Sequence, residues 1–177
     1  MTGQVLPRAE DFECSFTSSS PAATRAFGER VGGLLRGGEI ILLHGPLGAG
    51  KTCFVQGACR VSHENAEVVS PTFTLVNTFP GEFTIHHLDF YRVRAGDDMM
   101  DIGVGEILDE VLDGRAVALV EWPDLFLPEL GPTTPRIELL VLPGDAPDER
   151  RWHGRGQPEL PQAWRDIFAD LAAADPG

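Results

Sequence analysis

The sequence predicts a single α/β domain in which helices flank a central sheet of mixed parallel and antiparallel strands. Two continuous apolar runs, residues 39–44 and 116–120, are typical of short strands that are buried on both faces of a parallel sheet. The first run leads through a glycine-rich turn into an amphipathic stretch, which gives the order strand, turn, helix. Segments 72–79 and 82–89 alternate around a Pro-Gly turn and therefore indicate an antiparallel hairpin. A chain of 177 residues is long enough for one domain with a substantial core.

The same patterns predict the remaining elements along the chain. A short strand at 12–16 is followed by Ser18-Ser19-Ser20-Pro21, which places N-cap residues ahead of a proline and predicts a helix from about Pro21 to Leu35. Segment 97–113 is expected to be helical only in parts, because glycines interrupt it. Toward the C-terminus we expect strands at 136–142 and 151–154, a linker-like stretch at 143–149 and a terminal helix at 161–173. The single domain is expected to span residues 1–177.

The charge balance and the composition exclude several classes of protein. The chain has 27 acidic against 14 basic residues, a formal charge of −13, which argues against holding nucleic acid through a broad basic face. Lys51 is the only lysine, so no second lysine remains for Schiff-base or pyridoxal-phosphate chemistry. The three cysteines lack Cys-x-x-Cys spacing, and no apolar run is long enough to span a membrane. We therefore expect a cytoplasmic protein with no membrane partner.

Residues 45–52, Gly-Pro-Leu-Gly-Ala-Gly-Lys-Thr, fit the phosphate-loop pattern G-x-x-x-x-G-K-[ST] and lie between the predicted strand and helix. Glycines at such positions let successive backbone N–H groups wrap a phosphate at the positive end of the following helix. Lys51 is then expected to reach the β- and γ-phosphates, and the Thr52 hydroxyl to ligate magnesium. The alternative is a glycine turn that only caps a helix. Because the only lysine of the chain stands in this motif, we predict that the protein binds a nucleoside triphosphate with Mg²⁺.

Two carboxylates are candidates for the magnesium site and for hydrolysis. Glu121 ends the apolar run 116–120, and Asp89 ends Ile85-His86-His87-Leu88. The strand that leads to Glu121 is more continuously apolar, so it is expected to lie beside the phosphate-loop strand and Glu121 to hold the metal. Asp89 is then expected to position the attacking water or to contact the metal through water. The alternative for both is that they only cap the next turn.

Further side chains near these carboxylates could belong to the site. The Thr72 hydroxyl could sense the γ-phosphate as a switch element does, or Ser70-Pro71-Thr72 could simply begin a strand. Trp122 is either a core anchor or a neighbour of the bound triphosphate. Adjacent histidines on a strand point to opposite faces, so His86 and His87 cannot easily chelate one ion. One of them is expected to pack and the other to face the site.

Five motifs taken together resemble, in order and spacing, the bacterial TsaE (YjeE) family of small P-loop ATPases. They are GPLGAGKT (45–52), SPTFTLVN (70–77), HLDFYR (87–92), IGVGEILD (102–109) and VEWP (120–123). The resemblance covers about residues 12–142, and the stretches after Pro123 and at 143–161 depart from the family. It implies a P-loop NTPase domain with a mixed sheet. It also implies an ATPase that is slow alone and acts with the TsaB–TsaD pair in making N6-threonylcarbamoyladenosine at position 37 of ANN-decoding tRNAs.

The resemblance also implies roles for individual residues. ATP is expected to contact the loop and the start of the helix, residues Gly45, Pro46, Leu47, Gly48, Ala49, Gly50, Lys51, Thr52 and Cys53. Thr52 and Glu121 would hold magnesium, Asp89 would serve hydrolysis, and Thr72 would act as a switch, with Lys51 completing the catalytic set. Trp122 would lie by the active site, and Ser20 (within Ser18–Ser20) and Arg150 or Arg151 would lie near the base.

Two other functions remain open from the residues alone. A small-molecule kinase could use the same loop, although no arginine-rich lid is evident in the sequence. A nucleotide switch that binds but does not hydrolyse is the other. In each case the acidity of the chain implies that any contact with tRNA comes mainly through partner proteins.

Overall fold

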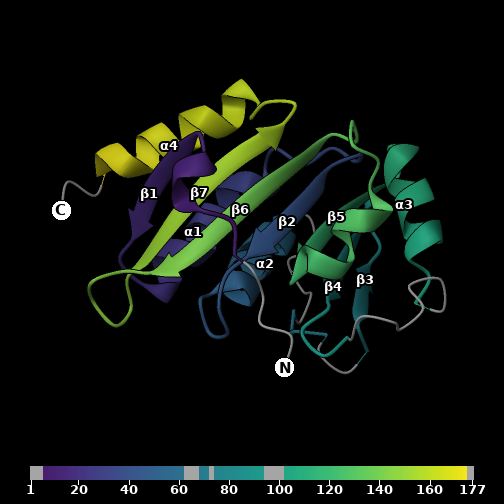
Figure 1. The fold of residues 1–177 in the computed structure, drawn as a ribbon, viewed down its shortest axis with the longest axis horizontal. Coiled ribbons are helices and arrows are strands. Elements are labelled where there is room, and N and C mark those ends of the chain that lie inside the picture. Colours follow the sequence, from purple (N-terminus) through teal and green to yellow (C-terminus); the bar gives the residue numbers. More distant parts are fainter. Residues whose placement is uncertain (1–5, 62–67, 72–73, 94–101, 175–177) are drawn as a thin grey trace.

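The computed structural model describes residues 6–61, 68–71, 74–93 and 102–174 (Figure 1). Its strands are β1 (Cys14–Ser18), β2 (Ile40–His44), β3 (Val76–Phe79), β4 (Thr84–Asp89), β5 (Ala116–Glu121), β6 (Arg136–Pro143) and β7 (Arg150–Gln157). Its α-helices are α1 (Pro21–Gly32), α2 (Lys51–Arg60), α3 (Val104–Leu112) and α4 (Gln162–Ala174). Short 3-10 turns are η1 (Ala9–Asp11), η2 (Pro123–Leu125) and η3 (Leu127–Glu129).

The described strands form one seven-stranded sheet in the order β1-β7-β6-β2-β5-β4-β3. Strands β6, β2, β5 and β4 are parallel to one another and form its centre. Strands β7 and β1 extend one edge and β3 the other, all with antiparallel pairing (Figure 1). The predicted α/β class with a mixed sheet flanked by helices is therefore confirmed, and so is the position of the Glu121 strand beside the phosphate-loop strand.

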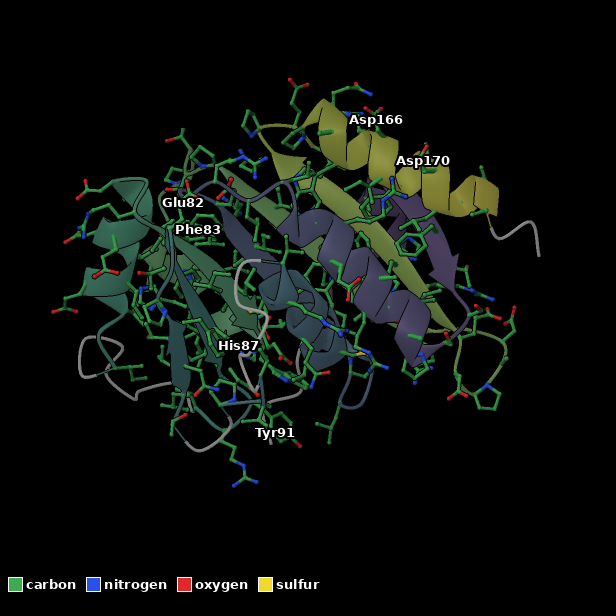
Figure 2. All side chains as sticks on the ribbon, turned by 180° about the vertical axis from the view of Figure 1, so that it is seen from behind. Glu82, Phe83, His87, Tyr91, Asp166 and Asp170 are labelled. Carbon is green, nitrogen blue, oxygen red and sulfur yellow. The ribbon has the colours of Figure 1, made fainter. Side chains whose placement is uncertain are left out.

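Both faces of the central strands are buried, each by a different set of helices. In β2 the side chains of Ile41 and Leu43 enter a core cluster shared with α1, α2 and α4, while Leu42 enters a second cluster shared with α3. Figure 2 views the sheet from the side of α1 and α2. This two-sided burial explains why the strand reads as a continuous apolar run rather than an alternating one. No helix in the described parts of the chain is long and apolar enough to cross a bilayer.

Helices α1 and α2 approach each other so closely that glycine is required at their contact. A Cβ built on Gly57 would lie 2.1 Å from the Arg25 carbonyl oxygen, and one on Gly32 would lie 2.3 Å from the Ala58 carbonyl oxygen. Helix α1 is also tied to α4, because Arg30 Nη2 lies 2.7 Å from Asp170 Oδ2. The phosphate-loop helix is thus held against a second helix as well as against the sheet.

Three predicted boundaries differ from the structure for identifiable reasons. The first strand covers 14–18 rather than 12–16, because Phe12 still closes the turn η1 and Ser18 pairs with β7. Helix α1 ends at Gly32 rather than at Leu35, because the N–H groups of Leu34 and Leu35 bond to the carbonyl oxygens three residues earlier, which is a turn rather than an α-helical pattern. Strand β7 covers 150–157 rather than 151–154, because β1 and β6 pair with it on both sides. Residues 72–73 and 97–101 of the predicted hairpin and helix lie outside the described residues.

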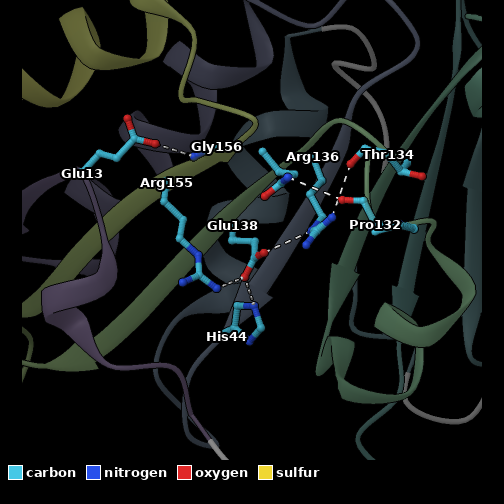
Figure 3. A network of polar contacts seen from close by, with 9 residues as sticks. Glu13, His44, Pro132, Thr134, Arg136, Glu138, Arg155 and Gly156 are labelled. Atoms are coloured by element: carbon cyan, nitrogen blue, oxygen red, sulfur yellow. Dashed lines mark hydrogen bonds and ion pairs between the residues drawn. The ribbon is translucent and has the colours of Figure 1, made fainter.

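A buried charged network crosses the face of the sheet that does not carry α1 and α2 (Figure 3). The Glu138 carboxylate on β6 accepts hydrogen bonds from Arg155 Nη2 at 2.7 Å and from Arg136 Nε at 3.1 Å, and His44 Nε2 lies 3.2 Å from it. Burial acts to raise the pKa of Glu138, but the contacts and charges of His44 and Arg155 outweigh it and lower the pKa to about 2. His44 is the last residue before the phosphate loop, so the network anchors the strand that carries the loop.

Candidate functional site

The predicted site residues meet where β2, β4 and β5 end. Because these strands are parallel, their carboxyl ends lie at one edge of the sheet, which is where α/β proteins bind ligands. A cavity of about 340 Å³ opens there, lined by Leu47, Gly48, Ala49, Gly50, Lys51, Thr52, Cys53, Ser70, Asp89, Tyr91, Glu121 and Trp122. A second cavity of the same volume lies beside η1. The phosphate loop does not contribute to it, because its lining residues are Ala9, Glu10, Phe12, Glu13, Cys14, Ser15 and His153.

The phosphate loop has the backbone shape that its glycines were expected to provide. Gly48 and Gly50 have φ values of 75° and 102°, in the left-handed region that favours glycine, and Gly50 is the N-cap of α2. The space where a Cβ of Gly48 would lie is open within 4 Å. Arg150 Nε donates a hydrogen bond to the Ala49 carbonyl oxygen at 3.1 Å. The start of β7 therefore braces the loop from outside.

Lys51 is buried, with 3 % of its surface exposed, and it lines the cavity. Its Nζ donates hydrogen bonds to the carbonyl oxygens of Gly45 at 2.7 Å and Pro46 at 2.9 Å. Burial lowers the pKa of Lys51 to about 8, and the carboxylates of Glu121 and Asp89 oppose that shift. The Lys51 ammonium is thus partly desolvated and lies near the carboxylates of Glu121 and Asp89.

Thr52 and Glu121 are brought into direct contact from α2 and β5. The Thr52 hydroxyl donates to Glu121 Oε1 at 2.8 Å. His87 on β4 places its Nε2 2.9 Å from the same oxygen. Glu121 is 3 % exposed, and it therefore ends its strand inside the site rather than in a solvated turn.

Asp89 lies beside Glu121 because the two residues are register partners in β4 and β5. Its carboxylate accepts hydrogen bonds from the Ser70 hydroxyl and from the Tyr91 backbone N–H, the latter at 3.0 Å. Both strand-end carboxylates thus face one cavity. Thr72, predicted as a switch residue, lies outside the described residues.

Trp122 forms an aromatic wall of the cavity together with Tyr91. The ring centroids lie 4.8 Å apart, and Lys51 Nζ lies 4.1 Å from the centre of a Trp122 ring. Trp122 has φ 58°, a left-handed conformation that is unfavourable for a bulky residue, and such strained residues cluster at functional sites. It is thus a member of the site and also packs against the core cluster of α3.

The other predicted contacts lie at different distances from this centre. Cys53 lines the cavity, and its thiol donates to the Pro21 carbonyl oxygen at 3.2 Å. Ser20 caps α1, accepting from the Ala23 N–H at 3.1 Å, and is not among the cavity-lining residues. Arg150 reaches the loop through Ala49. The nucleotide contacts assigned to Ser20 and Arg150 stay predictions.

Two members of the site, Ser70 and Tyr91, were not assigned to it from the sequence, and His87 was named only as one of two candidates. Ser70 and Tyr91 line the cavity, and His87 contacts Glu121 from a fully buried position. Strand alternation carried the signal for His87, because residues two apart on a strand share a face and Asp89 was already a candidate. The expectation that one histidine faces the site is confirmed for His87, while His86 packs toward α3.

The donor set suits a nucleotide with magnesium. The cavity presents a hydroxyl and two carboxylates, and oxygen ligands are the ones Mg²⁺ prefers. The loop amides precede the N-terminus of α2, which is favourable for a phosphate. The open space at Gly48 leaves room for a ligand against the backbone.

Comparison with known proteins gives this arrangement a family. The model of the family described as "Threonylcarbamoyl adenosine biosynthesis protein TsaE" matches residues 18–150. The chain belongs to the TsaE family. The resemblance stated from the five motifs is thereby confirmed, and the matched span includes the phosphate loop, Asp89 and Glu121.

Individual TsaE relatives and a solved structure agree with this assignment. The tRNA threonylcarbamoyladenosine biosynthesis protein TsaE of Treponema pallidum is 39 % identical over 125 residues, which cover 71 % of this chain and 90 % of that protein. The TsaE of Bacillus subtilis is 33 % identical over 133 residues, covering 75 % and 78 %. The crystal structure of Bacillus subtilis YdiB superposes with a TM-score of 0.64 at 26 % identity, covering 91 % of this chain and 95 % of that one.

Proposed function

We propose that the chain is a magnesium-dependent ATPase that serves threonylcarbamoyladenosine modification at position 37 of ANN-decoding tRNAs, in the cytoplasm, together with a TsaB–TsaD pair. Family membership supports the pathway. The observation that supports the ATPase is the convergence of Lys51, Thr52, Asp89 and Glu121 on one cavity beneath a phosphate loop. Catalysis in such a site is mostly electrostatic, since positioned charges stabilise the transferring phosphoryl group.

Lys51 is proposed to neutralise phosphate charge. In the present structure its ammonium is held by two loop carbonyl oxygens and the face of Trp122. Phosphate oxygens would replace the two carbonyl oxygens as acceptors of the Lys51 hydrogen bonds. Hydrogen bonds to a charged acceptor are stronger than those to a neutral carbonyl. Negative charge nearby also favours the protonated form of a lysine whose pKa burial has lowered to about 8.

Glu121 and Asp89 are proposed to divide the metal and water roles. Glu121 accepts from the Thr52 hydroxyl, so Thr52 can offer an oxygen lone pair to magnesium while its own O–H stays directed at Glu121 Oε1. Asp89 is held by Ser70 and the Tyr91 N–H and is proposed to orient water for hydrolysis or to contact the metal through water. When bound, magnesium would neutralise charge on the phosphates.

Partner proteins are proposed to supply the contact with tRNA. Binding to nucleic acid is driven by cationic side chains that displace counterions from the phosphates. A chain with a formal charge of −13 is therefore not suited to hold tRNA by itself. The isolated protein should retain little tRNA at physiological salt, and the complex should retain it.

The first experiment tests the phosphate loop. Lys51→Ala and Thr52→Ala are each expected to weaken ATP binding or hydrolysis about 10- to 100-fold, because each removes one contact to a charged group. Binding is measured by titration calorimetry and hydrolysis as phosphate release in the presence of the partner pair. Arg60→Ala is the matched control, since it removes a cation from the far end of the same helix. Unchanged ATP affinity and hydrolysis in Lys51→Ala would contradict the proposal.

A second pair of variants tests the carboxylates. Asp89→Asn should lower hydrolysis while ATP stays bound, and Glu121→Gln should raise the magnesium concentration needed for half-maximal hydrolysis. The opposite pattern would exchange the two roles. Transfer of labelled γ-phosphate to nucleosides or shikimate-like acids, instead of release as free phosphate, would favour a kinase. Binding without turnover in the complete complex would favour a switch.

A further inference from the structure

Glu121 receives two hydrogen bonds on a single oxygen. Thr52 Oγ1 and His87 Nε2 lie 2.8 and 2.9 Å from Oε1, while Oε2 makes no hydrogen bond with any described residue. The three residues come from α2, β4 and β5. The carboxylate is therefore fixed from two sides, and its second oxygen remains available.

The sheet register dictates that His87 lies beneath the site. In the parallel pair β4–β5, Asp89 is opposite Glu121 and His87 is opposite Leu119. Residues two apart on a strand share a face, so His87 and Asp89 point toward α2, on the same side as Glu121. His87 is fully buried on β4, and Figure 2, which views the sheet from the side of α1 and α2, labels it beside α2.

The hydrogen-bond chemistry assigns one proton of the His87 ring. A carboxylate oxygen only accepts hydrogen bonds, so Nε2 must be the donor in its contact with Glu121. The other ring nitrogen, Nδ1, is buried without a hydrogen-bond partner among the described residues. An unpaired buried polar atom is unfavourable, and an apolar side chain would avoid it. Packing alone therefore does not account for a histidine here, whereas the bond to Glu121 does.

The neighbouring His86 is a natural contrast because both of its nitrogens are paired. Its Nδ1 lies 3.1 Å from Thr78 Oγ1, and its Nε2 lies 2.8 Å from Glu110 Oε2. It points to the opposite face and ties β4 to α3. The two adjacent histidines therefore differ in their surroundings: His86 is bonded to structural partners, whereas His87 is bonded to a residue of the site.

We propose that His87 is a positioning residue that holds Glu121 through its Nε2–H, so that the carboxylate serves Thr52 with Oε1 and the shell of the bound metal with Oε2. This inference rests on the proposed function, because it names a further residue of the same magnesium site. His87 acts only through Glu121. Residues that orient metal-binding groups typically change metal affinity or activity about 10- to 100-fold when they are replaced.

The first test needs neither metal nor nucleotide. In ¹⁵N-histidine-labelled protein, NMR correlation spectra report which ring nitrogen carries the proton, and the His87 signals are assigned from their absence in His87→Gln. We expect the Nε2–H form in the free protein and a change in the Nε2 shift in Glu121→Ala. A Nδ1–H form, or an Nε2 shift that does not respond to Glu121→Ala, would overturn the inference.

The second test measures the metal. Mn²⁺ binding to the protein–ADP complex is followed by electron paramagnetic resonance for the wild type, His87→Leu and His87→Gln. The glutamine amide can donate from about the place of Nε2, so His87→Gln should stay within about threefold of the wild type while His87→Leu loses about tenfold or more in Mn²⁺ affinity. ADP affinity without metal should change little in either variant. Equal Mn²⁺ affinity in the wild type and His87→Leu, or equal losses in both variants, would contradict the proposal.

Controls separate this inference from the proposed function and from folding. His86→Leu, the adjacent histidine on the other face, should lower the unfolding temperature without changing Mn²⁺ affinity. If His87→Leu does not fold, the NMR tautomer of His87 and the Mn²⁺ affinity of His87→Gln still test the positioning role. If nucleotide binding does not depend on Lys51, the proposed function fails, whereas a Lys51-dependent site that ignores His87 overturns only the positioning role.

Discussion

Replacing Glu138 by glutamine should reveal a pH-dependent part of the stability. The carboxylate lies in the buried network with Arg136, Arg155 and His44, and its contacts lower its pKa from 4.5 to about 2 despite burial (Figure 3). A carboxyl group with a lower pKa in the folded chain than in the unfolded chain stabilises the fold at pH values above 4.5. That stabilisation is lost as the pH falls toward 2. Glu138→Gln removes the titrating group and leaves its cationic neighbours in place.

The magnitude follows from the size of the shift. A change from 4.5 to about 2 corresponds to about 3 kcal/mol at neutral pH, at about 1.4 kcal/mol for each pKa unit. At pH 3 the unfolded chain has already taken up the proton while most folded molecules have not, so about 2 kcal/mol of this has been lost. The free-energy difference between the wild type and Glu138→Gln should therefore shrink by about 2 kcal/mol between pH 7 and pH 3.

Urea unfolding at the two pH values measures this difference directly. Each curve is fitted for the free energy of unfolding, and the wild-type value minus the variant value is compared between pH 7 and pH 3. Glu29→Gln is the control, because that carboxylate is half-exposed and its ion pair with Arg60, at 3.4 Å, is of the weak surface kind. Its difference should change by less than about 0.5 kcal/mol. The same difference at both pH values for Glu138→Gln would refute the reasoning.

Two further predictions concern the helix contact and the aromatic wall. Gly57→Ala should lower the free energy of unfolding by about 1–3 kcal/mol, because its Cβ would lie 2.1 Å from the Arg25 carbonyl oxygen. The matched Gly33→Ala, whose Cβ has no neighbour closer than 3.4 Å, should change it by less than about 1 kcal/mol in urea unfolding, and equal losses would contradict the packing account. Binding of ADP with Mg²⁺ should change the tryptophan fluorescence, because the phosphates of the proposed ligand would draw Lys51 from the ring of Trp122. The change should vanish in Trp122→Phe, and its persistence there would show that another tryptophan reports.

Local patterns were sufficient to predict the centre of the fold. The loop at 45–52 and the apolar run before Glu121 are each specified by consecutive residues, and burial on both faces follows from the lack of alternation. The order β2-β5-β4 then brings Asp89 beside Glu121. That pairing could be anticipated because parallel strands end at the same edge.

Contacts between distant segments were beyond local patterns. Arg150 donates a hydrogen bond to the Ala49 carbonyl oxygen, 101 positions away in the sequence, and no local sequence pattern around either residue predicts this contact. Glu138 is the one carboxylate in a largely apolar strand, and it is buried where β7 brings Arg155 opposite it. The long-range pairing of β6 with β7 therefore decides the surroundings of both residues.

The position of Lys51 gives a physical reason why this chain of many arginines has its lysine here. Its ammonium is held between two loop carbonyl oxygens, 2.7 and 2.9 Å away, and 4.1 Å from the face of Trp122. A lysine presents a compact point charge with three rotatable donors, whereas an arginine presents a planar fork that needs acceptors in one plane. Two carbonyl acceptors and a ring face all contact the one nitrogen Nζ, and a compact charge satisfies them together. In the proposed function the same compact charge would exchange the loop carbonyls for phosphate oxygens.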